Sequence, residues 1–272
     1  MEETKPKAKP RLHQSQMSML HRCGVQYARR YVNGEILPPA VAMLEGTAVH
    51  KGAEVDLSHK MATGELAPLE AVHEAAVDAF RLGREKDGLL LDEEEKAEGE
   101  KVVVARAIDE IAVLSALHHR ELAPVIEPTH LERTFELELK GYPVNLAGTL
   151  DVQEATSVRD LKTKGQTPNQ TMVDRSEQLS VYALAVKTLD GKAPETVGID
   201  ALVKTKTPKV VILTSTRSED DFKATLLRVE AAVRVIEAGA FYPADPEHWV
   251  CTRKFCGYFD SCPFGSRRRV QV

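Results

Sequence analysis

Hydrophobic residues recur at helical spacing through the first half of the chain and at every second position after residue 130. The first pattern predicts helices starting within residues 14–18 and near 40–46, and over 69–84 and 92–122. Pro38-Pro39 and Pro124 interrupt it, because proline cannot continue a helix. The period of two predicts strands over 131–139, 144–152 and 158–162, a three-stranded meander.

The remainder of the chain returns to a mixed pattern. We expect a helix over 176–189, strands over 197–203 and 210–214, a last helix opening at 218–220, and an irregular segment after Gly239. Helices followed by strands, a helix, two more strands and a helix predict an α/β protein. Its mixed central sheet is flanked by helices, with an N-terminal helical part and a cysteine-rich C-terminal tail.

The composition and net charge exclude few classes of protein. The 272 residues are 43% hydrophobic, enough to bury a large core, and the net charge of −5 does not by itself indicate nucleic-acid binding. Acidic residues gather in residues 92–100, however, whereas basic residues gather elsewhere, so a basic groove on an acidic protein is compatible with the sequence. No apolar run is long enough for a transmembrane helix, and the charged N-terminus lacks the apolar core of a secretory signal. We therefore expect a cytoplasmic protein with reduced thiols and no membrane partner.

Two carboxylates and one ammonium converge on the second and third strands of the meander. Asp160 and Lys162 are two residues apart and lie on one face of a strand, and Asp151 ends the strand before it. Placing these charges together is costly unless a metal ion or a phosphate is bound there. A solvated hairpin with scattered charges is the alternative interpretation.

The cysteines form a second constellation. Cys251, Cys256 and Cys262 lie close together in the irregular tail, and Cys23 is the fourth cysteine of the chain. Four thiolates suit either a [4Fe–4S] cluster or a zinc ion. Such a centre would connect residue 23 to the C-terminal tail and would be structural.

Taken in order, five motifs resemble those of the PD-(D/E)XK nuclease superfamily, and especially its RecB-like branch, which includes CRISPR-associated RecB-like exonucleases with an iron–sulfur cluster. The motifs are Gly46-Thr47-Ala48-Val49-His50, Gly148-Thr149-Leu150-Asp151, Asp160-Leu161-Lys162-Thr163, Gln178-Leu179-Ser180-Val181-Tyr182 and the four cysteines. They span about residues 14–265. The resemblance implies a restriction-endonuclease-like fold, and it favours [4Fe–4S] over zinc, although the first two tail cysteines have four residues between them where the family usually has two.

The resemblance also implies roles for single residues. His50, Asp151, Asp160 and the backbone carbonyl of Leu161 would hold Mg²⁺ or Mn²⁺, and Lys162 would hold or deprotonate the attacking water. Gln178 and Tyr182 would contact the scissile strand. Independently of the resemblance, Lys204 and Lys206 follow a predicted strand and are candidate phosphate contacts.

These expectations define domains and a function. We expect a disordered basic tail at 1–12, a single nuclease domain at 13–265, and a basic tail at 266–272. The domain comprises a helical part (about 13–125), a catalytic sheet core (about 130–240) and a cluster-binding tail (241–265). The predicted function is a metal-dependent DNA nuclease, more an exonuclease than an endonuclease, acting on ends or single strands in recombination, repair or phage DNA processing, in a bacterial or phage-infected cell.

The chain has no Gly-x-x-x-x-Gly-Lys-Ser/Thr motif, so any unwinding would require a helicase or recombination protein as partner. Two alternatives stay open. One is a non-catalytic nucleic-acid-binding subunit on the same fold, and the other is a zinc-stabilised interaction module.

Overall fold

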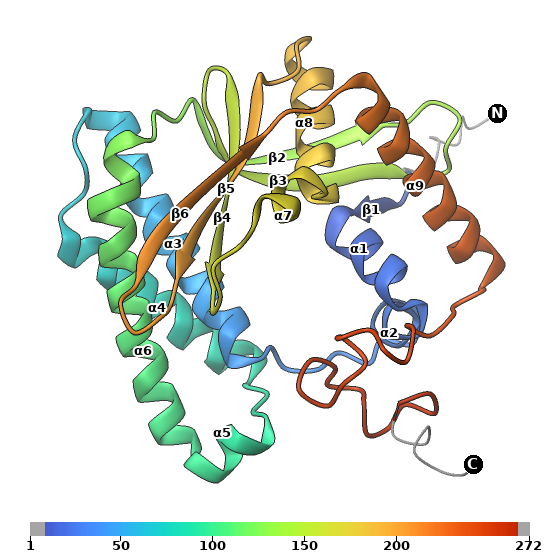
Figure 1. Cartoon of the computed structure of the whole chain (residues 1–272), viewed down its shortest axis with the longest axis horizontal. Helices are drawn as coiled ribbons and strands as arrows, with labels where there is room; N and C mark the ends of the chain where they lie inside the picture. Colours follow the sequence, from blue (N-terminus) through green and yellow to red (C-terminus); the bar gives the residue numbers. More distant parts are fainter. Residues whose placement is uncertain (1–8, 266–272) are drawn as a thin grey trace, which may run out of the picture.

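A six-stranded mixed sheet forms the centre of the computed structural model, which describes residues 9–265 (Figure 1). The strands are β1 (Arg11–His13), β2 (His130–Glu138), β3 (Asn145–Gln153), β4 (Ser157–Lys164), β5 (Thr196–Val203) and β6 (Lys209–Ser215). The main path is β1-β3-β4-β5-β6, and β2 pairs with β3. The predicted meander and the α/β class are therefore confirmed.

Helices cover both faces of this sheet. The helical elements that precede β2 in the sequence are α1 (Gln14–Arg22), α2 (Gly24–Tyr27), the π-helix η1 (Ala28–Val32), α3 (Val41–Thr63), α4 (Leu69–Asp87), α5 (Glu93–Glu98), α6 (Glu100–Leu117), the π-helix η2 (His118–Leu122) and the 3₁₀ turn η3 (Ala123–Val125). The helices that follow β4 in the sequence are α7 (Gln170–Asp174), α8 (Glu177–Asp190) and α9 (Glu219–Ala238). No helix of the described residues is long and apolar enough to span a bilayer.

Two hydrophobic cores follow from this layering. Apolar side chains of α3, α4 and α6 pack against one face of the sheet, where Val152, Leu161 and Leu202 point toward them. Side chains of α1, α8 and α9 pack against the other face, on Leu146, Leu150 and Val158. The alternation along the strands thus serves two cores, as expected for a sheet covered on both sides.

The N-terminal boundary differs from the expected one. Arg11–His13 pair in parallel with Asn145–Ala147 of β3, and the side chain of Leu12 is only 3% exposed. The stretch expected to be a disordered tail over 1–12 therefore ends in a strand that belongs to the sheet. Residues 1–8 and 266–272, which carry the rest of both expected tails, lie outside the described part of the chain.

The long helix expected over 92–122 is interrupted. The Asp92 carboxylate accepts a hydrogen bond from the Glu95 amide, and the Glu95 carboxylate accepts one from the Asp92 amide. This capping box starts the short α5. Gly99 then adopts φ of +96°, a conformation that ends α5 and begins α6. The acidic run predicted to open one long helix therefore opens a separate one.

Candidate active site

The site lies where β3 and β4 separate. The two strands pair only at Val152–Arg159 and Gln153–Val158, next to their turn. Beyond these pairs, the Asp151 carboxylate accepts a hydrogen bond from the Leu161 amide at 3.0 Å, taking the place of a ladder bond. β1 pairs with β3 at 145–147, so among the described residues the middle of this β3 edge carries no ladder partner. An acidic side chain is thus held at a fork in the sheet.

Asp160 and Lys162 occupy one face of β4, as their spacing predicts. The Lys162 ammonium lies 2.9 Å from Oδ1 and 2.7 Å from Oδ2 of Asp160, whose side chain is 1% exposed. Burial raises the pKa of Asp160 above its usual range, and the nearby Lys162 charge opposes this effect. A buried carboxylate of this kind is stabilised in its ionised form by a further cation.

His50 reaches the fork from α3. Its Nε2–H donates to the Leu161 carbonyl at 2.8 Å, and its Nδ1 lies 3.5 Å from Asp151 Oδ2. Gly46, one turn earlier, faces Thr163, because a Cβ there would lie 3.5 Å from the threonine Oγ1. This is an ordinary van der Waals distance, so the start of α3 lies beside β4 at this position.

Gly148 has a comparable steric role in β3. It is the cross-strand partner of Phe135, and a Cβ at Gly148 would lie 2.6 Å from the ring carbon Cζ. The phenyl ring covers the strand three residues before Asp151. The Gly-x-x-Asp motif therefore combines a packing requirement with a chemical one.

One carboxylate at the fork was missing from the sequence prediction. Ligand atoms of His50, Glu132 and Asp151 lie within 4.8 Å of one another, with Glu132 contributed by β2. Partial burial, together with the charges of Asp151 and Glu54, raises the pKa of Glu132 to about 7. The signal in the sequence was weak, because Glu132 belongs to an alternating strand in which several glutamates face solvent.

Oxygen donors and one imidazole make up this site, and that set suits a hard divalent ion such as Mg²⁺ or Mn²⁺. Donor atoms within 4.8 Å of one another also agree with the spacing that a shared ion requires. His50 and Asp151 of the predicted ligands therefore fit a divalent ion, together with Glu132. Asp160 is not in this group within the described residues, and its carboxylate binds Lys162.

Gln178 and Tyr182 lie on α8, beside the same carboxylates. The Gln178 side-chain amide donates to the Tyr182 hydroxyl at 2.7 Å, and the tyrosine ring packs edge-on against Phe135. Burial and the charges of Asp160 and Asp151 raise the pKa of Tyr182. The phenol thus stays protonated and can donate a hydrogen bond.

The two lysines predicted to contact phosphates have different surroundings. The Lys204 ammonium binds Glu45 and, at 2.9 Å, Glu110, so it joins the segment after β5 to α3 and α6. Lys206 is exposed in the turn between β5 and β6. The structure therefore engages Lys204 in a protein ion pair, and only Lys206 presents its charge to solvent.

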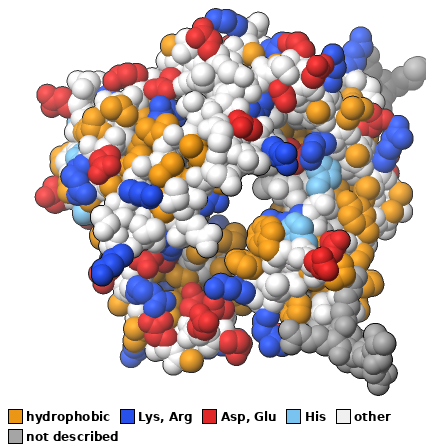
Figure 2. Space-filling model, in the orientation of Figure 1, with side chains coloured by type: hydrophobic (Ala, Val, Ile, Leu, Met, Phe, Trp, Pro, Cys, Tyr) orange, Lys and Arg blue, Asp and Glu red, His pale blue; other side chains and the backbone are white. Residues whose placement is uncertain are grey.

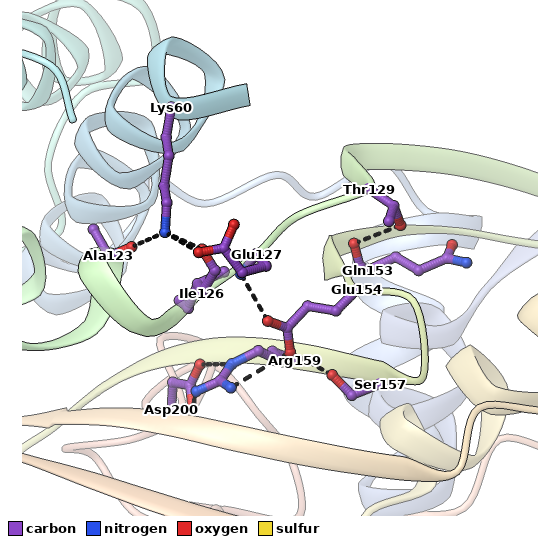
Figure 3. A network of polar contacts seen from close by, with 10 residues as sticks. All are labelled: Lys60, Ala123, Ile126, Glu127, Thr129, Gln153, Glu154, Ser157, Arg159 and Asp200. Carbon is purple, nitrogen blue, oxygen red and sulfur yellow. Dashed lines mark hydrogen bonds and ion pairs between the residues drawn. The ribbon is translucent and has the colours of Figure 1, made fainter. Parts of the chain in front are cut away.

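Behind the fork, a polar network connects α3 to the sheet (Figure 3). The Lys60 ammonium binds the Glu127 carboxylate at 2.8 Å and the Ile126 carbonyl at 2.7 Å, and the Glu127 amide donates to Glu154. Arg159 lies between Glu154 and the buried Asp200, with 2.7 and 2.8 Å bonds to the latter. These contacts hold the helix of His50 and the strands of Asp151 and Asp160 in one frame.

The four cysteines are brought together by the chain fold. Cys23 caps α2, and its sulfur accepts hydrogen bonds from the Gln26 amide at 3.4 Å and the Ala244 amide at 3.3 Å. Burial raises the pKa of Cys256, and the neighbouring Cys23, Cys262 and Cys251 raise it further. All four cysteines are half-buried. Thiolates are the ligands that zinc and iron–sulfur centres take. Within residues 9–265, no three of these sulfurs lie within 4.8 Å of one another.

Comparisons with known proteins place this chain in a family. No curated protein matches the chain. A crystal structure of a candidate exonuclease from Eubacterium rectale is similar in fold, with a TM-score of 0.53, 14% identity, and coverage of 90% of this chain and 87% of that one. A structure of the protein SSO0001 has a TM-score of 0.42 at 14% identity, with 96% and 90% covered. The family model described as the PD-(D/E)XK nuclease superfamily matches residues 11–263, and the chain therefore belongs to that superfamily.

Proposed function

We propose that the protein is a divalent-metal-dependent deoxyribonuclease of the RecB-like branch that degrades DNA from an end. The observation that carries the proposal is the convergence of His50, Asp151, Asp160 and Lys162 at one fork of the sheet. The Leu161 carbonyl faces the same point and supplies a neutral oxygen donor.

Each residue has a role that its position allows. A bound Mg²⁺ or Mn²⁺ would supply Lewis acidity toward the phosphate. Asp151, Asp160, His50 and the Leu161 carbonyl would hold the ion, and Lys162 would hold or deprotonate the attacking water. Gln178 and Tyr182 would donate hydrogen bonds to the scissile strand, because both lie on the face of α8 next to the carboxylates. Lys206 could contact a more distant phosphate.

The shape of the molecule favours a substrate with a free end. Figure 2 shows an opening through the molecule with basic and histidine side chains on its rim. In Figure 1 this region is bordered by β4 and the start of α3 on one side and by α1 and α7 on the other. A passage enclosed by one chain can be entered only by a strand that has an end. This topology supports exonuclease action on single strands.

A circular substrate tests this proposal directly. Labelled single-stranded DNA of one sequence, linear and circular, is incubated with Mn²⁺ or Mg²⁺ and wild-type protein or Asp160→Asn. We expect linear DNA to be degraded, circular DNA to persist, and the variant to be inactive on both. Equal cleavage of both forms would show an endonuclease. If neither form is cleaved in the presence of metal, the result would favour the non-catalytic DNA-binding subunit.

We further propose that Cys23, Cys251, Cys256 and Cys262 hold a [4Fe–4S] cluster. The placement of Cys23, Cys251 and Cys262 around Cys256 supports this assignment, and structural zinc is the alternative. Protein purified without air should be brown and contain iron, whereas a colourless protein containing one zinc per chain would exclude the cluster. A reducing, cytoplasmic environment would keep these thiols available. Roles in recombination, repair or phage DNA processing, with a helicase as partner, follow from the same proposal.

A further inference from the structure

Glu132 of β2 faces the metal-binding residue Asp151 across the sheet. The pairing of Leu131 with Val152 and of Arg133 with Leu150 sets the register on both sides, and this register places Glu132 opposite Asp151. Cross-strand neighbours project from the same face of a sheet. The ligand atoms of Glu132, Asp151 and His50 accordingly lie within 4.8 Å of one another.

Without a bound cation, the negative charges around Glu132 repel one another. Within residues 9–265, no hydrogen bond or ion pair reaches the Glu132 carboxylate. Glu54 lines the same pocket, and its carboxylate is paired with Lys51 at 2.8 Å. Like charges directly opposite on neighbouring strands destabilise a sheet. A cation between Glu132 and Asp151 would reverse the sign of this interaction.

The backbone at Glu132 is distorted as well. Its φ is +44°, and it is the only non-glycine residue of the described chain with positive φ. Side chains rarely adopt this conformation, because their Cβ meets the backbone. The distortion interrupts the regular β2–β3 pairing at the one position opposite Asp151. The strand thus departs from regular geometry where its carboxylate faces the site.

We propose that Glu132 is a further ligand of the divalent ion held by His50 and Asp151, on the solvent-exposed side of the site. This inference rests on the proposed metal-dependent function. Hard divalent ions take six or more oxygen donors, so a site with three side chains and one carbonyl leaves positions for another carboxylate. Three strands and one helix then contribute to the centre, with β2 providing the outermost ligand.

Calorimetric titration of Mn²⁺ into chelator-treated protein tests the assignment without using activity. The variants are Glu132→Gln and, as a matched control, Glu54→Gln, which removes one negative charge from the same pocket. We expect Glu132→Gln to weaken Mn²⁺ binding at least tenfold, in the range of about 10–100-fold known for groups around a metal. Glu54→Gln should change the Mn²⁺ affinity less than about threefold, since this substitution alters only the electrostatic field at the site.

Thermal unfolding separates a ligand from a structural residue. In EDTA, Glu132→Gln should melt at or above the wild-type temperature, because one of two facing carboxylates has become neutral. Added Mn²⁺ should raise its melting temperature less than that of wild type. A lower melting temperature in EDTA with an unchanged Mn²⁺ effect would overturn the inference.

The outcomes also distinguish this inference from the function on which it rests. Wild-type affinity in Glu132→Gln, with binding lost in Asp151→Asn, would remove Glu132 from the centre and leave the nuclease proposal intact. Equal weakening in Glu132→Gln and Glu54→Gln would likewise overturn the assignment as a ligand. Failure of the wild-type protein both to bind Mn²⁺ and to cleave DNA would overturn both.

Discussion

His118 should make the stability of the protein fall between pH 6.5 and pH 4. It begins η2, is 2% exposed, and its Nδ1 has no hydrogen-bond partner among the described residues. The nearby Asp56 carboxylate lies 4.0 Å away and instead binds His119 at 2.9 Å. Burial, with the charges of His50, His119 and Arg159, lowers the pKa of His118 from 6.5 to about 4.

The sign of the effect follows from proton linkage. Above pH 6.5, His118 is neutral in both the folded and the unfolded state and adds no pH dependence. Below pH 6.5 the unfolded chain binds a proton that the folded chain does not bind until about pH 4. The free energy of unfolding should therefore decrease with falling pH, by about 3 kcal/mol in total and about 2 kcal/mol by pH 5.

Urea unfolding at pH 7.5 and pH 5.0 measures this difference. His118→Phe replaces the imidazole by an uncharged ring, so its loss of stability between the two pH values should be smaller than that of wild type by about 2 kcal/mol. The exposed His130 provides the control, because His130→Phe removes a histidine that is already solvated. Identical pH dependence in wild type and His118→Phe would refute the reasoning.

Three further substitutions test other parts of the structure. Arg159→Met should lower the free energy of unfolding, measured in urea, by about 3–5 kcal/mol, because Asp200 would be left buried without its partner. A loss of less than about 1 kcal/mol would contradict a buried ion pair. Gly148→Ala should cost about 1–3 kcal/mol in the same assay through its clash with Phe135, and unchanged stability would contradict so close a contact between the strand and the ring. Lys162→Met should slow cleavage of linear DNA by about 10²–10⁴-fold, while its Mn²⁺ affinity, measured by calorimetry, stays within about threefold of the wild-type value. Full activity of this variant would exclude the proton-transfer role of Lys162.

Local sequence patterns predicted most of the fold. The alternation over 131–139 and the turns at residues 141–143 and 154–157 specify the meander, because side-chain direction in a strand depends only on neighbouring positions. The same local geometry places Asp160 and Lys162 on one face, and it places Gln178 and Tyr182 on one side of α8. The roles of these residues in cleavage stay a prediction that the proposed experiments test.

Several features depended on contacts between distant segments. Pairing of Arg11–His13 with β3 joins residues more than a hundred positions apart, and three residues carry too little periodicity to predict a strand. The ion pair of Lys204 with Glu45 was equally hidden, since exposed and buried lysines look alike in a sequence.

The sequence alone therefore determined the order of the longer helices and strands, the Asp-x-Lys face and the pair of residues on α8, all of which follow from short-range backbone geometry. Only the tertiary structure decided that Glu132 faces Asp151, because the strand register arises from the packing of β2 on β3. It also decided that Asp151 bonds the Leu161 amide at the fork of the sheet. Bringing carboxylates and an imidazole from separate elements to one point requires the two cores that hold those elements together.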